Sequence, residues 1–136
     1  RLYEFLYHLC RSYSHQIASA SLTGSQRDLQ RVTHVMNWVK VHYPEPLSLE
    51  TAADSLALSK EYFCRLFKKY TGQTFLEYLN DVRTMHLYED LQNSDETITV
   101  LMEKNGLSNY KIFMRTFKKL YGSTPQKMRS NRIRHV

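Results

Sequence analysis

The chain has 136 residues, of which 42% are hydrophobic and 24% are charged; this composition is typical of one folded domain and excludes wholesale disorder. Its net charge of +6 favours an anionic partner, and residues 104–136 are the source of this charge, because they hold nine Lys and Arg and no acid. No run approaches the ~18 uncharged apolar residues of a transmembrane helix, and residues 1–7 lack the cleavage site of a signal peptide.

The first 25 residues predict one short amphipathic helix and a linker. Apolar side chains recur there at the spacing of one helix face, namely Leu2, Phe5, Leu6 and Leu9. The serine-rich residues 12–25 are typical of a flexible connector. Because the chain does not begin with Met, we expect it to be a fragment of a longer protein, with a further domain that is missing here. The short helix should dock on that missing domain, which would leave this chain largely monomeric; the alternative is that it packs on the core of this chain.

The next part of the chain predicts three helices. Ser25 and Asp28 form a capping-box pattern at the start of the first helix, which should end before the Pro44-Glu45-Pro46 segment. Ser48 and Ser59 predict the N-caps of two shorter helices. The buried face expected for the second of these holds Phe63, Leu66, Phe67 and Tyr70.

The remainder of the chain predicts four more helices. Thr74 begins a capping-box pattern that opens the longest helix, expected over 74–91. A short helix is expected to start at Thr97, and Ser108 predicts the N-cap of its successor. The Thr124-Pro125 pair puts a proline in the first turn of a final helix. No segment alternates convincingly at a period of two, so we expect an all-α fold.

A repeat with an offset of 50 residues covers two of the predicted helices. Phe63-Cys64-Arg65-Leu66-Phe67-Lys68-Lys69 recurs as Phe113-Met114-Arg115-Thr116-Phe117-Lys118-Lys119, and Gly72 and Thr74 recur as Gly122 and Thr124. Each copy follows a short helix and a tight turn, which is the arrangement of a helix-turn-helix. The paired Phe residues are core in any helical bundle, and lysine pairs can be ordinary solvated side chains. The same basic face behind the same turn, present twice, favours DNA binding.

Further residues accompany the repeat at specific spacings, namely Leu47-Ser48-Leu49-Glu50-Thr51-Ala52-Ala53, Tyr78-Leu79, Arg83, Gly106-Leu107, Thr124-Pro125 and Arg129. With both copies, they make the chain from Val32 to Arg129 resemble the DNA-binding domain of the AraC/XylS-type bacterial transcription regulators. Leu87 and Met102 depart from the family pattern, because they are larger than its usual alanine; they imply a repacked second subdomain.

The resemblance implies seven helices in two helix-turn-helix subdomains joined by a long central helix. The DNA-binding domain would span residues 26–136, with a first subdomain at about 26–73, the connecting helix at 74–91 and a second subdomain at 92–132. Residues 1–25 resemble the end of an effector-binding and dimerising domain with its linker.

The resemblance also implies which side chains contact the bases of DNA. In the first copy they are Glu61, Cys64 and Arg65, and in the second they are Tyr110, Lys111, Met114 and Arg115. Arg65 is the best candidate, because a guanidinium can bond both O6 and N7 of guanine. Glu61 either accepts from a cytosine amine or only orients Arg65, four residues further along the helix. Cys64 is expected to be a small surface residue rather than a redox switch.

A second set of residues is expected to contact phosphates, which fix the register of a protein on DNA without reading its sequence. The set combines basic side chains with residues at or near helix N-termini, whose backbone N–H groups favour anions. It consists of Lys60, Lys68, Lys69, Thr74, Asn109, Lys118, Lys119, Thr124 and Arg129. Arg132 and Arg134 either add phosphate contacts or fray in solution.

The sequence gives no sign of an enzyme, a metal site or a cofactor site. No two of the six histidines stand three or four residues apart on one predicted helix, and there is no glycine-rich phosphate loop and no GxSxG motif. Cys10 and Cys64 form no CxxC pair, which argues against a zinc site or a disulfide scaffold and favours a reducing cytoplasm, here at the bacterial nucleoid.

These observations predict a sequence-specific DNA-binding transcription regulator that inserts two recognition helices into successive major grooves of a promoter. The helix expected over 74–91 would be ~27 Å long, a length that suits grooves one turn, ~34 Å, apart. The partners implied are double-stranded DNA, RNA polymerase and a small-molecule effector on the missing domain. The full-length protein is expected to be able to form a dimer, and this chain to be monomeric. The alternatives are a basic helical protein-interaction module for an acidic partner and a membrane-surface binder; the repeat favours duplex DNA over both.

Overall fold

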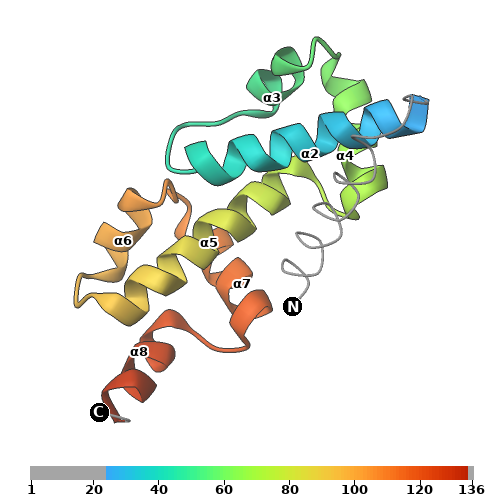
Figure 1. Ribbon diagram of the computed structural model, residues 1–136. Helices are drawn as coiled ribbons and strands as arrows, with labels where there is room; N and C mark the ends of the chain where they lie inside the picture. The colour runs from blue at the N-terminus through green and yellow to red at the C-terminus, as the bar shows by residue number, and fades with distance from the viewer. Residues whose placement is uncertain (1–23, 135–136) are drawn as a thin grey trace. The chain divides into compact units, whose positions relative to one another are not determined.

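The computed structural model describes residues 24–134, so the helix expected near the N-terminus lies outside the described residues. Within this range the chain forms seven helices and no strand (Figure 1). They are α2 (Gly24–His42), α3 (Leu49–Ser55), α4 (Lys60–Thr71), α5 (Phe75–Asn93), α6 (Ile98–Lys104), α7 (Tyr110–Tyr121) and α8 (Pro125–Arg134). The all-α prediction and the number of helices are confirmed.

The helices divide into two compact units. The first unit comprises the described residues as far as His42 together with Leu47–Glu77. The second comprises Tyr43–Pro46 and the described residues from Tyr78 onwards. Each unit therefore contains one of the two repeat copies, α4 in the first and α7 in the second.

The core of the first unit lies between α2 and the helix pair α3–α4. The fully buried residues of α2 recur at helical spacing, as Val32, Val35, Met36 and Val39. The Phe63, Phe67 and Phe75 rings pack against one another with centroids 5.7–5.8 Å apart. Two of these three contacts are edge-to-face, the geometry that aromatic rings prefer. The repeat's paired Phe residues are thus structural here, as expected.

The second unit has an equivalent core around the second Phe pair. Its buried members are Leu87, Leu91, Leu101, Met102, Leu107, Phe113 and Phe117. The rings of Phe113 and Phe117 lie 5.8 Å apart, nearly the spacing of Phe63 and Phe67. Leu87 and Met102, the residues predicted to enlarge this core, are both buried in it.

The segment Tyr43–Pro46, which we call the strap, belongs to the second unit although it follows α2 in sequence. The Arg83 Nε donates to the Tyr43 carbonyl at 2.6 Å, and its Nη2 donates to the Glu45 carbonyl at 2.7 Å. Burial lowers the pKa of Arg83. The Tyr43 ring stacks on His86 with centroids 3.9 Å apart. Burial, followed by the charges of nearby acids, raises the pKa of the Tyr43 hydroxyl.

Most of the predicted helix ends are confirmed. Ser48, Ser59 and Thr97 accept hydrogen bonds from the backbone N–H three residues further on, as N-caps do. Gly72 and Gly122 end α4 and α7 in the left-handed conformation, with φ of 79° and 74°.

Two predicted N-caps are wrong. The helix α2 begins at Gly24 and so already includes Ser25, and the Asp28 carboxylate pairs with Arg31 at 3.0 Å. The cap of α7 is Asn109, not Ser108, and its side chain accepts from the Ile112 N–H at 3.0 Å. The cap lies one residue later than predicted because the turn of the second helix-turn-helix contains one residue more than the turn of the first.

Candidate nucleic-acid interface

The helix α4 has one buried and one exposed face. Phe63 and Phe67 are fully buried, whereas the predicted base-reading residues Glu61, Cys64 and Arg65 are all exposed. This division follows from the sequence, because the aromatic residues recur at helical spacing and the polar residues fall between them. The structure therefore presents these three predicted base-reading residues together on one accessible surface.

The Arg65 guanidinium lies over the ring of Tyr62, 6.0 Å from its centroid. No ion pair joins Glu61 to Arg65 within the described part of the chain, so the alternative in which Glu61 orients Arg65 finds no support in this geometry. The aromatic neighbour was missed at the level of sequence. The available signal was a break in the repeat, where Tyr62 corresponds to Ile112.

The helix α7 presents the matching face of the second copy. Tyr110 is 52% exposed, and Lys111 and Arg115 are exposed as well. Met114 differs, because it is half-buried and packs against the core of the second unit. Three of the four predicted base-reading residues of this copy are therefore exposed.

The predicted phosphate-binding lysines fall into two classes. Lys68, Lys69 and Lys118 are exposed, and the Lys69 ammonium lies 5.4 Å from the ring centroid of Tyr70. Lys119 instead pairs with Asp81 at 2.9 Å, and the Asp81 side chain is only 4% exposed.

Lys60, which was also predicted to contact phosphate, pairs with Glu50 at 3.0 Å. This contact raises the pKa of Lys60. A hydrogen bond from its own backbone, followed by the interaction with Lys60, lowers the pKa of Glu50. Both side chains are well exposed, so the pair is easily exchanged for contacts with another charged group.

The predicted residues near helix starts act as caps in the free domain. The hydroxyl oxygen of Thr74 accepts from the Glu77 N–H at 3.1 Å, and that of Thr124 accepts from the Lys127 N–H at 3.3 Å. Asn109 caps α7 in the same way. These contacts satisfy part of the free N–H groups at each helix start.

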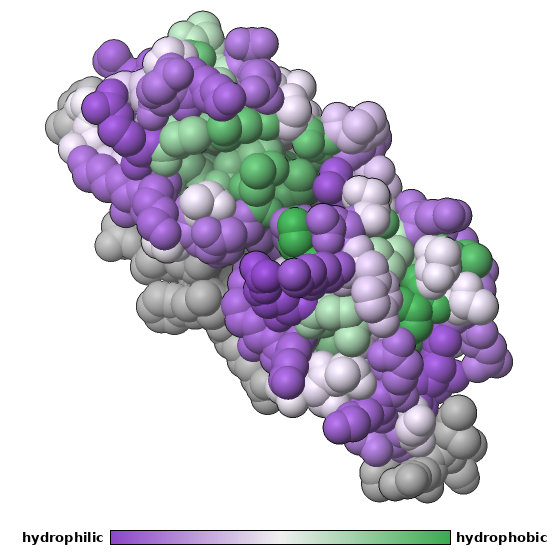
Figure 2. Space-filling view, turned by 180° about the vertical axis from the view of Figure 1, so that it is seen from behind, coloured by the Kyte–Doolittle hydropathy of each residue, from purple (hydrophilic) through white to green (hydrophobic). Residues whose placement is uncertain are grey.

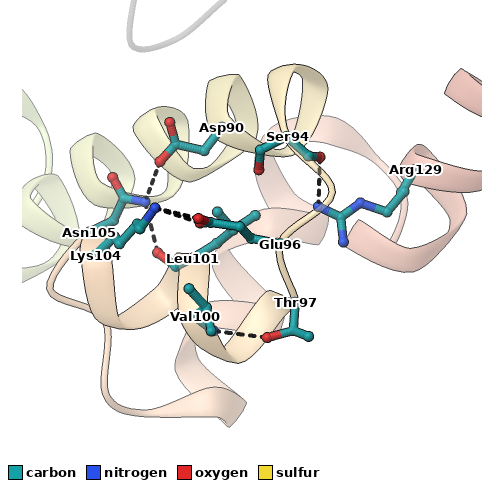
Figure 3. A network of polar contacts seen from close by, with 9 residues as sticks. All are labelled: Asp90, Ser94, Glu96, Thr97, Val100, Leu101, Lys104, Asn105 and Arg129. Carbon is teal, nitrogen blue, oxygen red and sulfur yellow. Dashed lines mark hydrogen bonds and ion pairs between the residues drawn. The ribbon is translucent and has the colours of Figure 1, made fainter.

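Arg129 lies in a network around the α5–α6 connection, where its Nη2 donates to the Ser94 carbonyl at 3.2 Å (Figure 3). In the same network the Asn105 amide donates to Asp90 at 3.0 Å, and Lys104 contacts Glu96 at 2.6 Å. Arg129 is half-buried, so this part of the predicted phosphate set has a structural contact already. A phosphate role for Arg129 stays a prediction.

Arg132 binds the end of α5 still more extensively. Its Nη1 donates to the carbonyls of Leu91, Gln92 and Ser94 at 2.8–3.1 Å, and its Nη2 contacts Asp95 at 2.7 Å. A cation at this place satisfies the carbonyls that a helix leaves free at its C-terminus. Sequence reasoning left phosphate binding or fraying open for Arg132; these contacts argue against fraying, and a phosphate role stays a prediction.

Hydrophilic side chains cover much of the face seen in Figure 2, with apolar patches between them. The large apolar residues that are exposed include Tyr62, Tyr110 and Ile112, which lie on the two predicted recognition helices. Within residues 24–134, no helix is long and apolar enough to cross a membrane. The same range contains no group of three His, Cys, Asp or Glu side chains arranged to hold a metal ion.

Known proteins share this arrangement. Residues 52–131, more than half of the chain, match the family model described as "Helix-turn-helix domain". The HTH-type transcriptional activator RhaS of Escherichia fergusonii is 31% identical over 111 residues, which are 82% of this chain and 40% of that protein. The chain spans less than half the length of the curated relatives it matches.

Solved structures agree with this match. A transcriptional regulator from Chromobacterium violaceum, whose description names AraC-type DNA-binding domains, has a TM-score of 0.67 and 25% identity over 76% of this chain and 92% of that chain. The DNA-binding domain of AdpA, solved with a target DNA, has a TM-score of 0.66 and 25% identity over 74% of this chain and 90% of that chain.

Proposed function

Because the chain belongs to the AraC-type helix-turn-helix family of DNA-binding domains, we propose that it is the DNA-binding part of a longer transcription regulator. In this proposal α4 and α7 enter successive major grooves of one duplex. A single observation supports it above the others: Arg65 and Arg115 occupy equivalent places in the two copies, and both are exposed on the face opposite the buried Phe pair. Two equivalent basic faces match a ligand that offers two equivalent grooves.

The proposed division of labour follows from exposure and existing contacts. Arg65 and Arg115 contact base edges, because a planar guanidinium matches guanine O6 and N7. Glu61, Cys64, Tyr110 and Lys111 are the further base-reading candidates. Lys68, Lys69 and Lys118 contact phosphates, since their side chains are exposed at the ends of the two recognition helices.

The remaining partners are those that the resemblance implies. We expect RNA polymerase and a small-molecule effector on a further domain to act on the full-length protein, and the full-length protein to dimerise. The binding of DNA would place the protein in the bacterial cytoplasm, at the nucleoid. No catalytic step is proposed.

The test compares Arg65→Ala with Lys118→Ala on a duplex selected from random DNA by the wild-type chain and on a scrambled duplex of the same composition. Arg65→Ala should cost about 1–3 kcal/mol on the selected duplex and relax the preference at one base pair. Lys118→Ala should weaken binding to both duplexes alike and reduce the salt slope by about one.

Equal losses on both duplexes for Arg65→Ala would show a phosphate contact and contradict the base-reading role. Binding that hardly changes between low and physiological salt would count against DNA altogether, because several neutralised phosphates make the affinity strongly salt-dependent.

A further inference from the structure

Tyr62 lies on α4 but is attached to α2. Its hydroxyl donates to the two carboxylate oxygens of Asp28 at 3.3 and 3.5 Å. Asp28 is in turn paired with Arg31 at 3.0 Å, and its side chain is only 20% exposed. The carboxylate therefore holds a defined place between Arg31 and Tyr62. The contact is longer than a typical O–H···O hydrogen bond, but it favours the orientation of the Tyr62 ring in which the hydroxyl reaches α2.

The ring of Tyr62 lies under the guanidinium of Arg65, 6.0 Å from its centroid. The two residues stand three apart on one helix and are therefore neighbours on its surface. An aromatic face attracts a guanidinium by its charge distribution and matches its planar shape. By holding Tyr62, Asp28 therefore also restricts Arg65, the side chain that is expected to contact a base.

The second copy of the repeat lacks this arrangement. Its Arg115 corresponds to Arg65, but the position of Tyr62 is occupied by Ile112, which has neither a ring nor a hydroxyl. Ile112 is 39% exposed and Tyr62 is 38% exposed, so the two positions have equal access to solvent. The difference between the copies is chemical rather than a difference in burial.

We propose that Tyr62 is a positioning residue, which holds the Arg65 guanidinium in the orientation needed to bond a guanine and which is itself held by Asp28. The inference rests on the proposed function, since it requires Arg65 to contact a base. Two parallel hydrogen bonds to O6 and N7 need the guanidinium plane in one orientation. An arginine already held near that orientation loses less freedom on binding. The arginine of the first recognition helix is thus more restricted before it binds its base than the arginine of the second.

The experiment uses the 136-residue chain and the duplex that the wild type selects from a random pool, with a scrambled duplex for comparison. Tyr62→Ala should weaken binding to the selected duplex roughly two- to fivefold and leave binding to the scrambled duplex unchanged. In an Arg65→Ala background, Tyr62→Ala should have no further effect, because the side chain that it positions is gone. Tyr62→Phe keeps the ring but not the contact with Asp28, so it should lose part of the preference.

Ile112→Ala is the matched control at the same position of the second copy. It should leave the preference at the base pair contacted by Arg115 unchanged, because Ile112 positions nothing there. Helix content and the free energy of unfolding are measured for every variant, and Tyr62→Phe provides the test should Tyr62→Ala disturb the fold.

Two results would overturn the inference while leaving the proposed function intact. One is an equal loss for Tyr62→Ala on both duplexes, which would indicate a phosphate contact or a structural role only. The other is a full effect of Tyr62→Ala in the Arg65→Ala background, which would show that Tyr62 acts independently. The proposed function itself fails if the wild type selects no duplex, and the base-reading role of Arg65, on which this inference rests, fails if Arg65→Ala is insensitive to sequence.

Discussion

Gly106 occupies a position where two separate constraints act on one residue. Its φ of +78° is a conformation that other L-residues adopt only at a cost. A Cβ there would also lie 2.9 Å from the Pro44 carbonyl and 3.0 Å from the Tyr43 carbonyl, both of which are backbone atoms of the strap. Gly122 has a similar φ of +74°, but a Cβ there would meet nothing within 4 Å.

Replacing each glycine by alanine separates the two constraints. Gly122→Ala should cost about 1–2 kcal/mol, which is the penalty of the left-handed conformation alone. Gly106→Ala should cost about 1–3 kcal/mol more, because the strap must move. Urea denaturation of the two variants measures the difference. Equal losses would mean that the strap yields without cost and that its packing contributes nothing.

Lys119 illustrates how a residue of plausible DNA-binding chemistry can have a structural partner. It pairs with Asp81, whose side chain is 4% exposed, whereas the adjacent Lys118 is exposed. Lys119→Ala should therefore lower the free energy of unfolding by about 1–2 kcal/mol, a moderate value because Lys119 itself is half exposed. Lys118→Ala should leave stability within about 0.5 kcal/mol of wild type. Thermal denaturation at matched ionic strength compares the two variants. An unchanged stability of Lys119→Ala would show that the pair with Asp81 does not stabilise the fold.

At the scale of helices, the sequence was sufficient to identify most elements but not every boundary. Capping signals at Ser48, Ser59 and Thr97 correctly located three helix starts, because a cap is a local interaction. The prediction that Ser108 is the N-cap of α7 failed because the adjacent residues Ser108 and Asn109 are both good caps. The length of the turn decides between them. The capping-box prediction at Ser25 and Asp28 failed because Asp28 pairs with Arg31 on the same helix and accepts from Tyr62 on a later one; only the contact with Tyr62 lies beyond local patterns.

The C-terminus of α5 gives a testable case of such a distant contact. Arg132 donates to three carbonyls there, from Leu91 to Ser94, across about forty positions of sequence. Arg132→Ala should increase hydrogen exchange in the last turn of α5 and in the following connection, because this end loses its cation. Lys127→Ala, on the same helix but without these contacts, is the control. Protection that is the same in both variants would show that Arg132 does not stabilise this helix end.

At the scale of the molecule, the repeat was the most informative feature of the sequence. It predicted two equivalent Phe-based cores and two exposed basic faces, which the structure contains. What the sequence could not provide was the set of long-range contacts that distinguish one basic residue from another. Lys119, Arg129 and Arg132 are chemically suited to phosphate, yet each has a partner within the second unit. The exposed faces of α4 and α7, by contrast, follow directly from the helical periodicity.

If both recognition helices bind one site on duplex DNA, the affinity must depend on the spacing within that site. Five base pairs inserted between the two halves of the selected duplex turn the grooves to opposite sides of the DNA, since one turn is ~10 base pairs. We expect a loss of affinity of about a hundredfold or more, because one helix can no longer bind together with the other. The same five base pairs added outside the site should have no effect. An affinity that is unchanged by the internal insertion would contradict the account, because it would mean that only one of the two helices contacts the DNA.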